Sequence, residues 1–103
     1  MKVRALTHLL DALSPQLATG HLRVSASWRN NEQALGLEHG ADPALMAYVF
    51  TYGQPLGRYG LDLGYPDLAD AAAAGVPLVQ EHLDLPALIG ILGSHFDLHP
   101  IPH

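Results

Sequence analysis

Histidine is the residue of this sequence with the widest range of chemistry, because it can ligate a metal ion or exchange a proton near neutral pH. Seven of the 103 residues are histidine, and His95, His99 and His103 are spaced by four. On a continuous helix that spacing would align three imidazoles, but Pro100 and Pro102 prevent a helix there. We therefore expect solvated surface histidines, and the sequence predicts no metal site and no cofactor.

Other patterns of catalytic residues are missing or misplaced. Ser94 and His95 are neighbours near the end of a predicted helix, where adjacent side chains point apart and cannot pair as nucleophile and base. Gly57 and Gly60 fall in a strand-like alternation that precedes no helix, which argues against a phosphate-binding loop. The chain has no cysteine, so thiolate chemistry and disulfides are excluded. We predict no catalytic residue.

The acidic side chains are concentrated in the second part of the chain. Residues 1–40 carry a net charge of +1, whereas residues 41–103 carry −6 with Arg58 as their only basic residue. Nucleic acids and anionic membranes both need a patch of Lys and Arg, so neither is an expected partner. A modest negative charge keeps a small protein in solution, and it also suits a cationic protein partner.

The aromatic residues are the other group with a potential binding role. A predicted hairpin over residues 45–65 places five of the seven aromatics on one face, namely Tyr48, Phe50, Tyr52, Tyr59 and Tyr65. Covered by helices, this face is part of the core. Left exposed, it is a rigid apolar surface with polar tips, which is typical of the residues that dominate protein interfaces.

The elements that position these residues begin with a helix. Apolar residues at steps of three and four between Val3 and Leu17 form one stripe, and Pro15 predicts that the regular helix ends near Leu13. Near the other end of the chain, Asp84 is a predicted N-cap of a helix whose apolar stripe reaches Phe96.

A first hairpin is predicted to turn at residues 30–31, which are both asparagine. This turn pairs apolar positions on one face, Val24 with Leu37 and Ala26 with Leu35. On the other face it pairs opposite charges, and this agreement supports the register. The packed face is predicted to hold Trp28, Val24, Leu35 and Leu37, and the solvent face to hold Arg23 opposite Glu38 and Arg29 opposite Glu32.

A second hairpin joins residues 45–52 to residues 58–65 through a four-residue loop over positions 53–56. That loop length pairs Phe50 with Tyr59, Tyr48 with Leu61 and Met46 with Leu63. After it, residues 66–75 are predicted to form a short helix, and residues 76–81 fit either a helical turn or an extended segment.

Together these elements predict one α+β domain over residues 1–103, with an N-terminal helix, a four-stranded antiparallel meander and C-terminal helices on one face of the sheet. The chain is expected to be extended from about residue 97. Leucine and alanine account for 33 residues and arginine outnumbers lysine four to one, which is typical of GC-rich bacterial genomes. No targeting or membrane-spanning segment is apparent, so the cytoplasm is the expected location.

The function that fits this profile is a small acidic module that binds and masks a cationic protein, as toxin-immunity proteins and secretion chaperones do. Its partner would then be a toxin or a secreted effector, and the sequence leaves open whether the chain forms a homodimer. The alternative is a small ligand-binding or enzymatic domain that uses histidines beside a tyrosine-lined pocket. The predicted partner-binding residues are Tyr52, Tyr59, Asp62, Tyr65, Asp67, Asp70, Glu81 and Asp84.

Overall fold

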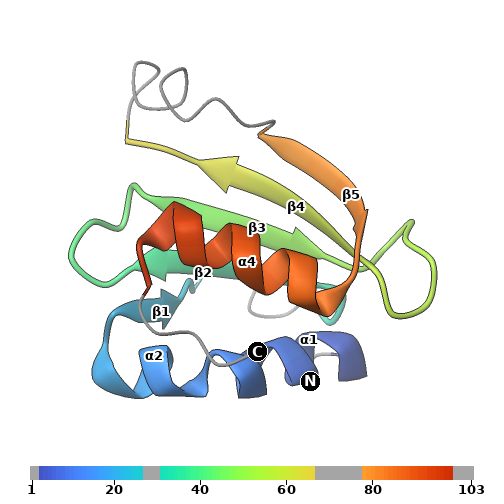
Figure 1. The fold of residues 1–103 in the computed structure, drawn as a ribbon, viewed down its shortest axis with the longest axis horizontal. Coiled ribbons are helices and arrows are strands. Elements are labelled where there is room, and N and C mark those ends of the chain that lie inside the picture. The colour runs from blue at the N-terminus through green and yellow to red at the C-terminus, as the bar shows by residue number, and fades with distance from the viewer. Residues whose placement is uncertain (1–2, 27–30, 67–77, 99–103) are drawn as a thin grey trace.

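The computed structural model describes residues 3–26, 31–66 and 78–98, and these form helices packed against one antiparallel sheet (Figure 1). This is the α+β class that the sequence predicts. The sheet has five strands in chain order, β1-β2-β3-β4-β5, where the sequence predicts four. The strands are β1 (Leu22–Val24), β2 (Ala34–His39), β3 (Met46–Phe50), β4 (Tyr59–Gly64) and β5 (Val79–Leu83).

The N-terminal leucines form two short helices, α1 (Arg4–Ala12) and α2 (Ser14–Thr19). The break at Leu13 confirms the predicted end of the first helix. Pro15 lies in the first turn of α2, where a missing N–H group breaks no hydrogen bond. α2 ends at Gly20, whose φ of +81° is a left-handed conformation that favours glycine.

The first hairpin has the predicted register. β1 and β2 pair Arg23 with Glu38 and Val24 with Leu37, and the Arg23 guanidinium lies 3.4 Å from the Glu38 carboxylate. Leu37 is buried, but Val24 is 47% exposed because β1 is a short strand at the edge of the sheet. The prediction that Val24 is packed is therefore wrong.

The rest of the first hairpin prediction is only partly covered by the structure. β1 ends at Val24, so the predicted pairing of Ala26 with Leu35 lies beyond the strand, and Ala26 is exposed. Leu35 is buried as predicted. The predicted positions of Trp28 and Arg29, like that of Asn30 in the turn, lie outside the described residues.

The register of the second hairpin differs by one residue from the prediction. β3 and β4 pair Phe50 with Gly60, Tyr48 with Asp62 and Met46 with Gly64. Both glycines make room for the larger residue opposite, since a Cβ atom at either position would meet the Phe50 ring or the Met46 side chain closer than 3.0 Å. The true loop is also longer, because it includes all residues between Phe50 and Tyr59.

A slip of one residue moves every side chain of a strand to the other face of the sheet. In the observed register Tyr59, Leu61 and Leu63 share a face with Ala47 and Val49, and all five are buried. This register buries the alternate apolar residues of β4, Tyr59, Leu61 and Leu63, in the core. The prediction that five aromatic side chains share one face is therefore wrong.

β5 is the strand that the sequence does not distinguish from a helical turn. It pairs with β4 through an irregular register, which shifts between Tyr59 and Leu61, and no residue of β5 is fully buried. Because its pattern of exposed and half-buried residues has no clean alternation, the hydrophobic periodicity of this segment is weak. The predicted short helix before it lies outside the described residues.

The helix α4 (Leu85–Phe96) lies across the sheet, and α1 and α2 lie beside β1 (Figure 1). Asp84 caps α4 as predicted, because its carboxylate accepts a hydrogen bond of 2.9 Å from the Ala87 N–H. Leu98 is still buried, so the chain stays packed through residue 98, and the rest of the predicted tail lies outside the described residues. The core contains Leu6, Leu9, Leu13, Leu35, Leu37, Ala47, Val49, Tyr59, Leu61, Leu63, Leu88, Ile89, Leu92 and Phe96.

Candidate functional site

The sheet has two unlike faces. The helices α1, α2 and α4 pack against the face that carries Leu35, Val49 and Leu61. The opposite face, which we call the outer face, carries the alternate residues of the same strands. Its central row is Gly36, Tyr48, Asp62 and Val79, which are paired in turn across β2, β3, β4 and β5. A polar and aromatic row on this face follows directly from the one-residue change in register.

Three aromatic side chains of the outer face form a cluster, which we call the aromatic cluster: Tyr48, Phe50 and Tyr52. The Phe50 ring lies 4.7 Å from the Tyr52 ring in a stacked arrangement and 5.6 Å from the Tyr48 ring. The two tyrosine hydroxyl groups meet at 3.1 Å. Phe50 lies over Gly60 and is almost buried, whereas Tyr52 is 46% exposed. The cluster is therefore a fixed apolar base with two hydroxyl groups linked to each other.

The acid–base properties of the aromatic cluster do not suit catalysis near neutral pH. Burial, together with the hydrogen bond to Tyr52, raises the pKa of Tyr48 to about 12. The Tyr48 hydroxyl therefore stays protonated at physiological pH and cannot act as a general base there. What the cluster offers is apolar area together with hydroxyl groups that can donate or accept hydrogen bonds.

Asp62 places a negative charge beside this cluster. It lies directly opposite Tyr48 on β4, and its other neighbour in the row is Val79, which is 57% exposed. Asp62 is itself exposed. Within the described part of the chain, the two Arg–carboxylate pairs are Arg23–Glu38 and Arg58–Asp84, so no described cation neutralises Asp62. The outer face thus combines aromatic area with an available carboxylate.

Two of the predicted tyrosines belong to the helical side of the sheet. Tyr59 is 3% exposed, its hydroxyl donates a hydrogen bond of 2.7 Å to the Ala5 carbonyl, and burial raises its pKa. Tyr65 is half-buried, and its ring meets the His95 ring edge-on at 4.7 Å. Tyr59 holds α1 against the sheet, so the structure gives it no surface for a partner.

The predicted acidic residues have different surroundings. Glu81 is exposed, and its Oε1 lies 3.5 Å from Nε2 of Gln54. Asp84 caps α4 and lies 3.7 Å from the Arg58 guanidinium, so it already has structural contacts. Asp67 and Asp70 lie outside the described residues. Of the eight predicted residues, Tyr52 and Asp62 are therefore the ones that the structure places together on the outer face.

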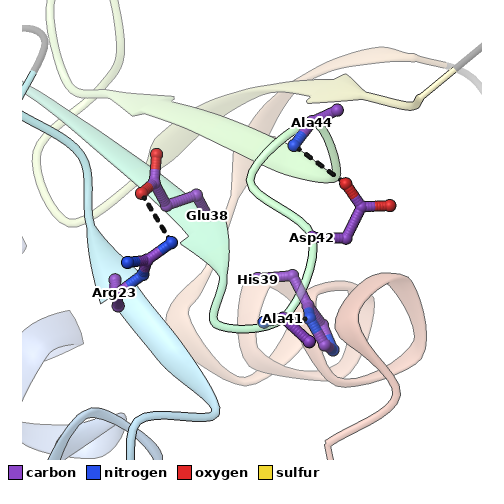
Figure 2. A network of polar contacts seen from close by, with 6 residues as sticks. All are labelled: Arg23, Glu38, His39, Ala41, Asp42 and Ala44. Carbon is purple, nitrogen blue, oxygen red and sulfur yellow. Dashed lines mark hydrogen bonds and ion pairs between the residues drawn. The ribbon is translucent and has the colours of Figure 1, made fainter.

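The end of β2 and the turn that follows it carry a histidine and two carboxylates close in sequence, but these side chains do not converge on one point (Figure 2). Glu38 is held by its ion pair with β1. The His39 ring accepts a hydrogen bond of 3.0 Å from the Ala41 N–H, and Asp42 accepts one of 3.2 Å from the Ala44 N–H. These contacts stabilise the turn. Among the described residues, no three His, Asp or Glu side chains could hold a metal ion together.

One exposed residue was missed by the sequence reasoning. Leu56, in the loop between β3 and β4, is fully exposed at 104% of its reference area. The signal in the sequence is the frame of Gly53, Pro55 and Gly57, which are turn-forming residues that can hold a leucine away from the core.

No protein-family model, curated protein or solved structure matches this chain. None of the described helices is long and apolar enough to cross a lipid bilayer.

Proposed function

We propose that this protein is a small acidic module that binds a cationic protein partner and masks it, in the manner of a toxin-immunity protein or a secretion chaperone of the bacterial cytoplasm. The observation that carries the proposal is the aromatic cluster beside the exposed carboxylate of Asp62 on the outer face. Tyrosine and other aromatic residues are enriched among the residues that contribute most to protein binding.

The rigidity of the aromatic cluster supports binding because little side-chain entropy remains to be lost. Tyr52 is stacked on Phe50, and its hydroxyl is bound to that of Tyr48. A side chain that is already fixed in its bound orientation avoids much of the ordering cost of association. Gly60 contributes by leaving room for the Phe50 ring where a Cβ atom would otherwise lie.

The charge distribution supports a cationic partner. Residues 41–103 carry a net charge of −6. One of their acids, Asp62, lies on the outer face and forms no ion pair with a described Arg. Such a field raises the rate of association with a positively charged protein and is screened by salt. The alternative hypothesis, an enzyme that uses a histidine beside a tyrosine, gains no support from His95. Its ring contacts Tyr65, but its Nε2 atom is hydrogen-bonded to the Met46 carbonyl at 2.8 Å.

The test uses a partner captured from the source organism by the immobilised chain and then purified. We expect the association rate to fall steeply between low and physiological salt, as long-range attraction is screened. Asp62→Asn should slow association, whereas Asp11→Asn, which makes the same charge change on exposed α1, should have a smaller effect. Asp67→Lys and Asp70→Lys should also slow association. Tyr52→Ala should mainly raise the dissociation rate, by roughly 10- to 100-fold.

Binding that is insensitive to salt would contradict the electrostatic part of this proposal. Equal effects of Asp62→Asn and Asp11→Asn would contradict the assignment to the outer face. In each variant, an unchanged unfolding transition shows that the binding change does not come from lost folding.

A further inference from the structure

The loop between β3 and β4 is built from two consecutive turns. In the first, the Gln54 N–H donates to the Thr51 carbonyl at 3.2 Å, and in the second the Arg58 N–H donates to the Pro55 carbonyl at 3.0 Å. The third residues of these turns are glycines with φ of +70° and +77°, a conformation that suits glycine at this position. Each turn of the loop is therefore closed by a hydrogen bond within the loop.

A side chain from this loop also ties it to the far strand of the sheet. Gln54 accepts a hydrogen bond of 2.8 Å from the His82 N–H, and its amide nitrogen lies 3.5 Å from the Glu81 carboxylate. His82 has a φ of +60°, which is unfavourable for a residue with a Cβ atom. The residue with this unfavourable backbone conformation is thus the same residue whose N–H group donates the hydrogen bond to Gln54. The loop is therefore held by its contact with β5 as well as by the hydrogen bonds of its own turns.

This bracing presents Leu56 to solvent. A single exposed leucine is ordinary on a protein surface. Here, however, the side chain is fully exposed on a loop that is fixed by two turns and by Gln54, so it cannot easily fold back onto apolar neighbours. Tyr52 belongs to the same loop and to the aromatic cluster. Leu56 therefore belongs to the same braced loop as Tyr52 and follows it by four residues.

We propose that Leu56 is an apolar anchor that inserts into an apolar pocket on the cationic protein bound by the outer face, an inference that rests on the proposed function. A lipid surface fits less well, because the exposed Glu81 carboxylate beside Gln54 would be repelled by anionic headgroups. A protein pocket fits because burying one fixed leucine adds affinity without further ordering of the loop.

Substitutions at Leu56 and at Gln54 test the apolar anchor and the bracing of the loop separately. Leu56→Ser should weaken binding of the captured partner by roughly 30- to 100-fold, mostly through faster dissociation. Leu56→Met keeps the apolar volume and should stay within about 3-fold of the natural chain. Both variants should unfold at the same temperature as the natural chain, because Leu56 is fully exposed.

Gln54→Ala tests the bracing without removing the anchor. It should weaken binding by roughly 5- to 10-fold, because the loop must then be ordered on association. Hydrogen exchange at the His82 amide should become faster in the same variant, since that N–H loses its acceptor. An unchanged His82 exchange rate, or full affinity in Gln54→Ala, would overturn the role assigned to the brace.

Photo-crosslinking with p-benzoylphenylalanine at positions 52, 56 and 8 shows which positions touch a bound protein. The experiment is carried out once with the captured partner and once with the chain alone. We expect adducts with the partner from positions 52 and 56 and none from position 8 on α1, with the position 56 adduct mapped to apolar residues of the partner. An adduct from 52 without one from 56, or full affinity in Leu56→Ser, overturns the anchor and leaves the proposed function standing. If neither position gives an adduct, both the anchor and the proposed function are overturned. An adduct with a second copy of the chain would show that the chain binds itself in place of a cationic partner.

Discussion

Gly60→Ala is the substitution that tests most directly how the sheet supports the aromatic cluster. The added Cβ atom would lie closer than 3.0 Å to three carbon atoms of the Phe50 ring, a separation that real Cβ contacts do not show. The backbone at Gly60 is not left-handed, so the destabilising part of the effect comes from this contact and not from backbone strain. Phe50 must therefore move, and Tyr52, which is stacked on it at 4.7 Å, must move with it.

The size of the effect can be bounded from two opposing contributions. Overpacking of a well-packed site typically costs about 1–3 kcal/mol. Replacing glycine by alanine within a strand returns roughly 0.5–1 kcal/mol of backbone entropy. We therefore expect a net loss of up to about 2.5 kcal/mol in the free energy of unfolding, and each kcal/mol lost lowers the melting temperature of a domain of this size by roughly 4–8 °C. Near-ultraviolet circular dichroism should report the displaced tyrosine.

The matched control is Gly90→Ala in the middle of α4, where nothing lies within 4 Å of the added Cβ atom. There the same chemical change should stabilise the protein by about 0.5–1 kcal/mol, because alanine favours helix. In a Phe50→Ala background the contact at Gly60 is gone, so Gly60→Ala should become neutral or stabilising. The reasoning is refuted if Gly60→Ala costs the same free energy with and without the Phe50 ring.

Three further predictions concern the helical side of the sheet. Tyr59→Phe removes the hydrogen bond to Ala5 and should cost about 1 kcal/mol in a urea titration, with a smaller loss if water reaches the carbonyl. Burial lowers the pKa of His95, so the free energy of unfolding should decrease as the pH falls below about 6.5, and His95→Asn should flatten that dependence. Asp84→Ala removes the cap on Ala87 and should lower stability by about 1 kcal/mol, measured by thermal unfolding, whereas Asp84→Asn should retain most of it.

The first hairpin could be predicted because its register is fixed by local signals. The pairing of Arg23 with Glu38 followed from a turn position and was checked by opposite charges. The cap at Asp84 was predictable for the same reason, because a cap depends on residues within one helical turn. These features need no knowledge of the rest of the fold.

The second hairpin was not predictable in this way, because its loop makes a contact with a residue far away in the sequence as well as its local turns. The turn residues suggest a four-residue loop, whereas the real loop is held by Gln54 against His82, 28 residues further on. The resulting difference of one residue moved Tyr59 from the expected binding face into the core. Tyr52 and Asp62 remained on the surface, but their shared position followed from the corrected register alone.

The irregular backbone of β5 also has a consequence for how the sheet ends. A regular terminal strand offers a row of free N–H and C=O groups on which another chain can add a further strand. At this edge the register shift and the left-handed His82 interrupt that row, and at the opposite edge β1 is only three residues long. Among the described residues, neither edge strand offers a long, straight template for strand addition, which disfavours growth into fibrils and unwanted sheet-to-sheet pairing. For the proposed function this means that the partner is recognised by side chains, through its shape and charge, since strand addition would accept almost any extended peptide.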